Sequence, residues 1–500
     1  MSNGQLILVA GALLLAGIAA SLAAGRIRVP GLVLFLGLGM AIGSDGTGWI
    51  EFSDYQLARR IGVIALALIL FEGGLTAGWA QIRSVLPSAV SLAVLGTILT
   101  AAVAGLVAAW LFDLSTLEGL LLGSVLAATD GAAIFGLLRG STLNRRVART
   151  LEGESGLNDP IAVLLVIGFI DWIQQPGYGV LDMIGLLARE LGIGLAVGVL
   201  VGWLAVHGLR RLRLATAGLY PVATVGVVGL AYGAADTLHG SGFLAVYLAG
   251  LALGGATIPA RQTITVFHQG LAWIAQVAMF VVLGLLVFPS QLDSVAVEGT
   301  VLALVVVFLA RPAAAWVATA FADLDPGERL VLGWAGLRGA VPVVLATFPV
   351  IKGVGHSVEF FNIVFFAVLL STLLQGSTFE AVATRLGATS SEPALGPDPP
   401  PPRPARSTAL IATSGPWPGD ADPAYPREVG GLPVMEQLRT RIDRPGALVT
   451  LADGRYAFTG EVFAIGSASA LQAQARRRMA RASSRAERAW WQDVIGALAR

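Results

Sequence analysis

Residues 151–170 read LEGESGLNDPIAVLLVIGFI, and this stretch decides the fold. Its second half is an unbroken apolar run of the kind that spans a membrane. Its first half sets Glu152, Glu154, Asn158 and Asp159 directly against that run. Ionisable side chains at bilayer depth cost several kcal/mol each, and they face a protein interior or a water-filled cavity when they occur. The stretch therefore indicates a functional site inside a membrane-embedded helix.

The composition of the whole chain agrees with a membrane protein. Of its 500 residues, 55% are hydrophobic and 13% are charged, and the mean hydropathy is +0.75. Soluble domains carry about 25% charged residues, and glycine, present 62 times here, is frequent in membrane helices. The absence of cysteine excludes disulfides, thiolate metal ligands and cysteine nucleophiles. The net charge of +1 is uninformative about partners, and we expect no nucleic-acid partner.

We predict an all-α polytopic protein with about thirteen transmembrane helices. The apolar spans are 5–24, 31–49, 57–77, 87–112, 117–138, 150–171, 181–207, 217–236, 241–257, 266–289, 294–320, 329–350 and 358–385. The first span is a helix rather than a signal peptide, because no positive charge precedes it and Arg26 and Arg28 follow it.

The distribution of basic residues predicts the orientation, with the N-terminus outside and the C-terminus in the cytoplasm. The inner ends collect Arg26, Arg28, Arg83, Arg139, Arg145, Arg146, Arg149, Arg210, Arg211, Arg213, Arg261, Arg329 and Arg385. The outer ends collect only Arg59, Arg60, Arg189 and Lys352.

The composition changes after the last span, so we divide the chain into four parts. Residues 1–386 form the transmembrane domain, and 387–407 a Pro-rich linker. Residues 408–466 are expected to form a small soluble α/β domain, with strand-like stretches TALIATS, ALVTLADG, RYAF and EVFAIGS. Residues 467–500 form a basic helical tail, either solvated or in contact with the inner leaflet.

Three charged residues are expected at similar depth in the membrane. Asp159 and Arg338 each lie nine residues into their spans, about 14 Å from the inner edge at the helical rise. Asp130 lies thirteen residues into its span, about 20 Å from the outer edge. Because isolated charges in lipid are so costly, we expect these three to face one another around a cavity.

The residue types in this region suit an alkali cation. Ser155 and Asp159 share one face of a helix, and Glu154 and Asn158 share the neighbouring one. With Glu72 of the intramembrane FEGGL, the sequence provides four carboxylates against one arginine. Oxygen ligands with net negative charge favour a hard cation, and the absence of histidine at this depth argues against a transition metal.

Two spans are interrupted by glycine and charge, at ATDGAA (128–133) and GLRGAVP (336–342). They lie seven spans apart and so run in opposite directions, as expected of two inverted repeats. Interrupted helices at corresponding places mark the binding site of many transporters. Asp130 and Arg338 would then partly neutralise the exposed helix ends.

Taken in order, FEGGL, ATDGAAIFGLLRG, LEGESGLNDP, GSGFLAVYLAG and GLRGAVPVVLATFP resemble the NhaP-type monovalent cation/proton antiporters. The similarity covers residues 5–385 and is greatest to the bacterial potassium/proton antiporters. It implies an NhaA-like fold with two crossed, interrupted helices, and a homodimer in the bacterial inner membrane. It also implies electroneutral exchange of K⁺, or alternatively Na⁺, for H⁺ by alternating access, a function that serves pH homeostasis. No cofactor is expected.

The resemblance also implies roles for individual residues. Asp159 matches the carboxylate that binds either the proton or the cation, and Asn158 the asparagine typical of electroneutral members. Thr129, Asp130 and Ser155 match residues at or beside the ion.

Further matches concern the surroundings of this site. Glu72 matches a carboxylate near the cytoplasmic funnel, either a ligand or a lining charge, and Glu154 with Arg338 matches a buried structural ion pair. Gly131 departs from the Pro or Ala common in relatives, and Arg311 matches a residue to which we assign no role. Residues of the C-terminal module resemble a degenerate TrkA-C domain, which implies a site for a small-molecule or nucleotide regulator.

We expect proton and cation to compete for Asp159, because burial favours the protonated carboxyl whereas a bound cation favours the carboxylate. Three alternatives belong to other classes. An intramembrane hydrolase using Ser155 lacks a histidine or lysine base at its depth. A passive channel would show a short repeated filter sequence, and the sequence contains none. A membrane sensor that uses the C-terminal module has no need of four midplane carboxylates.

Overall fold

The structure is a computed structural model, and it describes residues 3–27, 31–131, 143–212 and 214–390. Beyond these it describes six short strands and the isolated positions 472, 473, 476, 479, 492 and 495. The chain divides into two compact units, Met1–Gly396 and Pro397–Arg500. The end of the predicted span 117–138, most of the linker and most of the basic tail lie outside the described residues.

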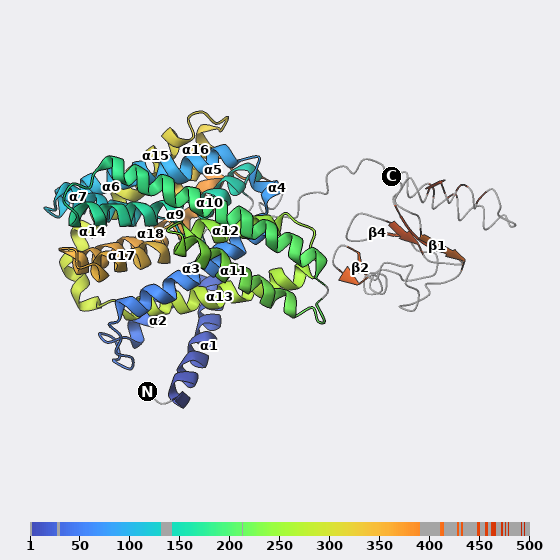
Figure 1. Ribbon diagram of the computed structural model, residues 1–500, viewed down its shortest axis with the longest axis horizontal. Helices are drawn as coiled ribbons and strands as arrows, with labels where there is room; N and C mark the ends of the chain where they lie inside the picture. Colours follow the sequence, from blue (N-terminus) through green and yellow to red (C-terminus); the bar gives the residue numbers. More distant parts are fainter. Residues whose placement is uncertain are drawn as a thin grey trace. The chain divides into compact units, whose positions relative to one another are not determined.

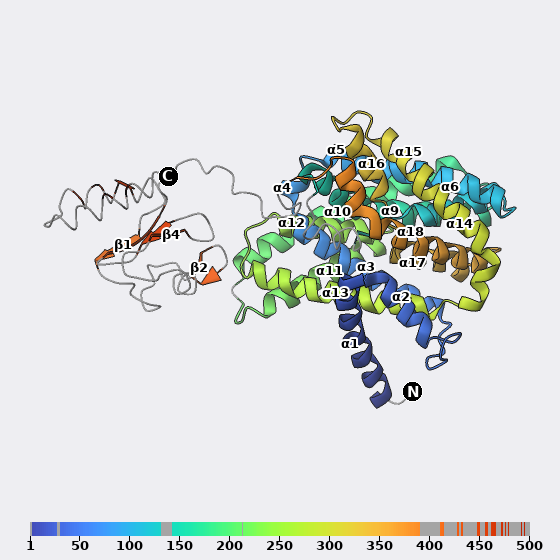
Figure 2. The same cartoon turned by 180° about the vertical axis from the view of Figure 1, so that it is seen from behind.

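The first unit is a bundle of helices (Figure 1). Its N-terminal half contains α1 (Asn3–Ile27), α2 (Gly31–Ile42), α3 (Tyr55–Ala77), α4 (Trp79–Ile82), α5 (Leu86–Ser91), η1 (Leu92–Gly96), α6 (Thr97–Leu111), α7 (Thr116–Ala127), α9 (Arg145–Gln174) and α10 (Val180–Arg211). Its C-terminal half contains α11 (Leu219–Thr237), α12 (Gly242–Gly254), α13 (Arg261–Leu285), η2 (Pro289–Val295), α14 (Ala296–Val305), η3 (Val306–Ala310), α15 (Arg311–Ala318), α16 (Pro326–Trp334), α17 (Ala340–Ile351) and α18 (Ser357–Arg385). Both views show α1 running away from the rest of the bundle (Figures 1 and 2).

The described helices are those of a multi-pass membrane protein. Eight of them, some continuing through a π or 3₁₀ turn, are long and apolar enough to cross a membrane. Five shorter apolar helices lie at Ile7–Leu22, Gly31–Ile42, Thr116–Ala127, Gly242–Gly254 and Ala340–Ile351. Each of the thirteen predicted spans overlaps one of these segments. The prediction of a helical membrane protein is therefore confirmed.

Helix α9 begins earlier than the sequence suggested. Asn144 caps it by accepting a hydrogen bond from the backbone N–H of Arg146 at 3.0 Å, so the helix starts at Arg145 instead of residue 150. Arg149 consequently lies inside the helix and is buried, whereas the orientation argument had placed it in an inner loop. The helix continues through Pro160, which has no N–H to donate to the carbonyl of Gly156.

The two expected interruptions are present and lie against each other. Helix α7 ends at Ala127 and the chain is non-helical through Asp130, while α16 ends at Trp334 and α17 begins only at Ala340. The backbone N–H of Asp130 donates to the carbonyl of Leu337 at 2.9 Å and so joins the two non-helical segments.

Two π turns, which are uncommon and often mark functional sites, occur in a second pair of helices. One is η1, between α5 and α6, and the other is η3, between α14 and α15. The helices that carry them are in contact, since the Ser91 hydroxyl donates to the Ala318 carbonyl at 2.7 Å. Arg311 is the first residue after η3, so this turn helps to set the direction of its side chain.

The second unit contains a four-stranded antiparallel sheet in the order β1-β6-β5-β4. The strands are β1 (Ile411–Ser414), β4 (Leu448–Thr450), β5 (Tyr456–Phe458) and β6 (Val462–Gly466), with β2 (Glu428–Val429) paired to β3 (Leu432–Pro433). The four strands of the sheet fall within the four stretches that the sequence identified as strand-like.

Candidate functional site

The site is built around the two interrupted helices, whose ends each meet an opposite charge. Asp130 lies at the N-terminus of α17, where its Oδ2 accepts a hydrogen bond from the Ala340 N–H at 3.1 Å. Arg338 lies at the C-terminus of α7, where its Nη1 donates to the carbonyls of Ala127 and Ala128 at 3.1 and 3.0 Å. An anion at a helix N-terminus and a cation at a C-terminus are both stabilising. The two charges therefore sit where the sequence placed them.

Gly339 makes this arrangement possible. A Cβ at residue 339 would stand 1.6 Å from Oδ2 of Asp130 and 2.5 Å from its Cβ. No larger side chain fits while the carboxylate remains at the end of α17. The glycine of GLRGAVP is thus required by the approach of a carboxylate from another segment.

Asp159 lies on α9 inside the protein, with only 3% of its surface exposed. Asp130 and Glu154 are the acidic residues that act on it electrostatically. Ser155, also buried, lies one helical turn before Asp159 on the same face. Asp130, Ser155 and Asp159 are therefore all buried in the interior, and Asp159 does not point to lipid.

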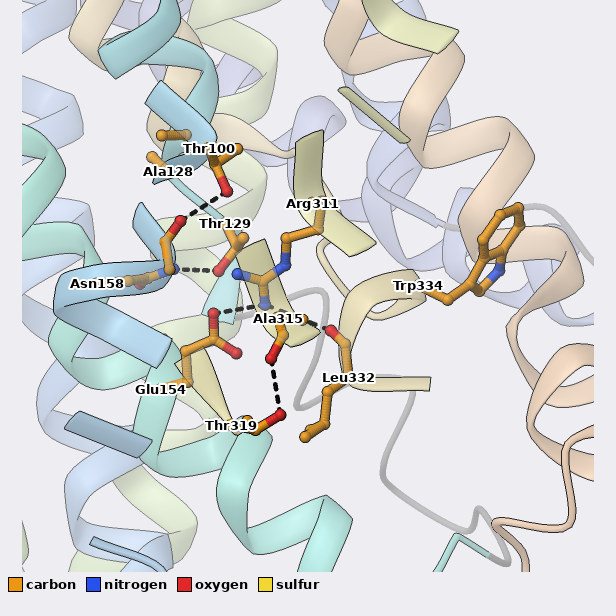
Figure 3. Close-up of polar contacts among 12 residues, drawn as sticks. Thr100, Ala128, Thr129, Glu154, Asn158, Arg311, Ala315, Thr319, Leu332 and Trp334 are labelled. Atoms are coloured by element: carbon orange, nitrogen blue, oxygen red, sulfur yellow. Dashed lines mark hydrogen bonds and ion pairs between the residues drawn. The ribbon is translucent and has the colours of Figure 1, made fainter. Parts of the chain in front are cut away.

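Asn158 and Thr129 join α9 to the first non-helical segment. The Asn158 side-chain amide donates to the hydroxyl of Thr129, and both residues are buried (Figure 3). This contact places the backbone beside Thr129 and Asp130 next to the helix that carries Asp159.

The predicted Glu154–Arg338 ion pair is wrong, because Glu154 pairs with Arg311 instead. Nη2 of Arg311 lies 2.5 Å from Oε1 of Glu154, and each side chain is 2% exposed (Figure 3). The same Nη2 donates to the Leu332 carbonyl at 3.4 Å. The Arg338 guanidinium is instead engaged with the carbonyls at the end of α7. Arg338 is nevertheless close enough to Arg311 and Glu154 to interact with both electrostatically.

A further buried pair, Arg149 with Glu152, was missed. The two side chains are 2.7 Å apart and three residues apart on α9, with 8% and 0% exposed. That spacing was a readable signal, but the early start of α9 was needed to bring Arg149 into the helix. Glu72, also buried, accepts a hydrogen bond from the Thr76 hydroxyl at 3.0 Å and interacts electrostatically with Glu152. The structure therefore associates Glu72 with Glu152 on the neighbouring helix.

The charge balance of the described interior differs from the count made from the sequence. Apart from Glu328 near the start of α16, it contains five acidic side chains, Glu72, Asp130, Glu152, Glu154 and Asp159, and three arginines, Arg149, Arg311 and Arg338. Among the described residues, no group of three His, Asp or Glu side chains has the arrangement of a metal site. Carboxylate, hydroxyl and amide oxygens with excess negative charge suit a monovalent hard cation.

These features define a class: a polytopic membrane protein with a buried, oxygen-rich and acidic site where two interrupted helices meet. Comparison with known proteins is specific about the family. The profile of the transmembrane sodium/hydrogen exchangers matches residues 10–385, and the chain belongs to that family.

Named relatives agree with this assignment. A K(+)/H(+) antiporter NhaP2 of Shewanella sp. (strain MR-4) is 40% identical over 365 residues, 72% of this chain and 63% of the relative. A K(+)/H(+) antiporter NhaP of Alkalimonas amylolytica is 42% identical over 381 residues, 75% of this chain and 66% of the relative. The chain thus spans a little under two thirds of these relatives' length. The structure of the sodium proton antiporter MjNhaP1 from Methanocaldococcus jannaschii matches with a TM-score of 0.66 and 25% identity, covering 76% of this chain and 99% of that one.

Proposed function

We propose that this protein exchanges a monovalent alkali cation for a proton across the membrane, with Asp159 as the shared binding site. The observation that carries the proposal is the burial of Asp159 beside Asp130, at the junction of the interrupted helices. Within the described part of the chain no ion pair joins Asp159 to a basic side chain. Because an uncompensated buried charge is costly, this carboxyl group is neutralised either by a proton or by a bound cation.

The cation would be held by oxygens around Asp159. Ser155 on α9, with Thr129 and Asp130 on the non-helical segment, supplies hydroxyl and carboxylate ligands of the type that alkali ions accept. Asn158 cannot ionise, so only one carboxylate of the Asn158–Asp159 dipeptide takes part in the exchange. One proton then leaves for each cation that enters, and the cycle is electroneutral.

We propose K⁺ as the preferred cation and Na⁺ as the alternative. Two K(+)/H(+) antiporters are 40% and 42% identical to this chain. A Na(+)/H(+) antiporter 1 of Methanocaldococcus jannaschii is 28% identical over 350 residues, 67% of this chain and 80% of the relative. The higher identity to the K(+)/H(+) antiporters supports K⁺ as the preferred cation.

The proposed architecture is a homodimer of thirteen-helix protomers with an NhaA-like core, in the bacterial inner membrane with the N-terminus outside. Two features support inverted repeats within the protomer: the pair of interrupted helices, and the pair of π turns η1 and η3. We further propose that the second unit is a degenerate TrkA-C-like regulatory domain, supported by its antiparallel sheet.

The proposal is tested by Asp159→Asn in the purified chain reconstituted in proteoliposomes. Proton movement on addition of K⁺ or Na⁺ is followed with a pH-sensitive dye, and we expect the variant to show none. Asp171→Asn, a more exposed acid near the end of the same helix, serves as the matched control and should exchange normally. Retained exchange in Asp159→Asn would show that another residue carries the ion.

A further inference from the structure

Two buried polar groups near the site have no part in the exchange described above. Oε2 of Glu152 pairs with Arg149 at 2.7 Å, but its Oε1 has no hydrogen-bond partner among the described residues. The hydroxyl of Tyr247 on α12 is likewise buried without a partner there, and the residue is 1% exposed. A buried polar group without a partner destabilises the folded protein, because it has lost its hydrogen bonds to water. Two such groups in one region suggest that they are retained for a function.

Gly156 shows how close these groups lie to α9. A Cβ at residue 156 would stand 2.2 Å from Cζ of Tyr247, the ring carbon that bears the hydroxyl. Gly156 lies four residues after Glu152 and three before Asp159, so all three share one side of the helix. The tyrosine therefore packs on α9 between the two carboxylates, which are about 10 Å apart along the helix axis.

The same place on α9 carries a backbone acceptor that lacks its normal helical partner. Pro160 cannot donate to the Gly156 carbonyl, so the normal helical hydrogen bond of that carbonyl is missing. On α3, Gly74 packs against the backbone of Tyr247. A Cβ added at Gly74 would lie 2.5 Å from the carbonyl oxygen of Tyr247. Glu72, two residues earlier on α3, interacts electrostatically with Glu152.

We propose that Tyr247 and Glu152 form a proton relay that connects Asp159 to the N-terminal end of α9, an inference that rests on the proposed function. When the proton leaves the site toward the N-terminal, cytoplasmic end of α9, the Asp159 carboxyl gives its proton to the Tyr247 hydroxyl, which passes its own proton to Oε1 of Glu152. The Tyr247 hydroxyl breaks one O–H bond as it forms another and ends unchanged. Asp159 becomes ionised, Glu152 becomes protonated, and intervening water completes the path.

The surroundings of Glu152 disfavour a second cation site. The groups that face Glu152 are Arg149 on its own helix, Glu72 on α3 and Tyr247 on α12. The Arg149 guanidinium, 2.7 Å from Oε2, already balances the Glu152 carboxylate and would repel an alkali ion. A proton is carried by a single O–H bond, and a phenol hydroxyl both donates and accepts it.

The test compares Tyr247→Phe and Glu152→Gln with wild type in proteoliposomes. Tyr247→Phe removes only the hydroxyl and leaves the ring on Gly156. Tyr232→Phe is the matched control, because that ring also packs on a glycine, Gly242, in the same bundle. Exchange is measured against pH at saturating cation, together with the cation concentration for half-maximal rate and the amount of folded protein.

We expect Tyr247→Phe and Glu152→Gln to lower the maximal rate about ten-fold or more at alkaline pH, where protons are scarce, and less at acidic pH. The half-saturating cation concentration should stay unchanged, and Glu152→Asp should restore part of the rate. Tyr232→Phe should keep the wild-type pH profile. If Glu152→Gln fails to fold because Arg149 is left unpaired, Tyr247→Phe alone decides.

The relay would be overturned if Tyr247→Phe kept the wild-type pH profile and the wild-type exchange rate per amount of folded protein. A change confined to the half-saturating cation concentration would also overturn it, because the cluster would then act on the cation. Failure of the proposed function is seen separately, as exchange that persists in Asp159→Asn.

Discussion

The buried pair of Glu154 and Arg311 makes a quantitative prediction about which arginine stabilises the core. The two side chains lie 2.5 Å apart at 2% exposure each. Removing one partner of such a pair leaves a buried uncompensated charge, which costs about 3–5 kcal/mol. We therefore expect Glu154→Gln and Arg311→Gln each to lower the thermal stability of the detergent-solubilised protein strongly.

The double variant separates this pair from the alternative. In Glu154→Gln with Arg311→Gln no charge remains unpaired, so the loss should be about 2–3 kcal/mol smaller than the sum of the single losses. Arg338→Gln is the matched control. It loses the hydrogen bonds to Ala127 and Ala128, and its effect should add to that of Glu154→Gln to within about 1 kcal/mol.

The measurement is thermal unfolding followed by the loss of monodisperse protein in size-exclusion chromatography, at one heating rate for all variants. The refuting result is the reverse pattern, in which Glu154 and Arg338 compensate each other while Glu154 and Arg311 are additive. That outcome would restore the pairing inferred from the sequence.

Three further predictions follow from the same geometry. Gly339→Ala should lose about 3–6 kcal/mol of stability from overpacking and from the displaced Asp130 hydrogen bond, whereas Gly37→Ala, with open space around it, should be neutral in the same unfolding assay. Asp45 lies beyond the end of α2 at Ile42, outside the membrane-spanning helix, and accepts a hydrogen bond from the Ser290 backbone N–H at 2.7 Å, which holds its pKa below the usual 3.8. The stabilisation that ionised Asp45 gives the folded state is complete above pH 3.8 and is lost as the pH falls through the lowered pKa. The stability difference between the wild type and Asp45→Ala should therefore shrink in acid, and a difference that grows would contradict this. Exchange by the wild type should be independent of an imposed membrane potential, and Asn158→Asp should make it voltage-dependent; an unchanged response in vesicles would contradict the role of Asn158.

The sequence was sufficient to predict the chemistry of the helix ends but not the pairing of the arginines. Asp130 and Arg338 could be placed because each lies within a short motif that interrupts a span, and a helix end selects the sign of the charge beside it. The partner of Glu154 depends on tertiary geometry. Arg311 is 157 residues away in the sequence, and its direction depends on the π turn Val306–Ala310, which has no clear sequence signal.

The boundary of α9 had a similar consequence. The apolar pattern begins near residue 150, so the charged turn before it was interpreted as a loop, and Arg149 was counted as a cytoplasmic charge. The helix capped by Asn144 starts five residues earlier, at Arg145, and this brings Arg149 into the interior beside Glu152. Hydropathy detects where a helix enters the membrane, whereas capping decides where it begins.

The two arginine pairs together account for the single-carboxylate exchange that we propose. Glu152 is balanced by Arg149 and Glu154 by Arg311, while Asp130 is held by the N-terminus of α17. Asp159 shares the same interior without an ion pair among the described residues, so in the proposed cycle the transported species neutralises it. The number of buried acids therefore does not determine the stoichiometry. In the proposed cycle the number left without a fixed positive charge does, and the two arginine pairs remove Glu152 and Glu154 from that number.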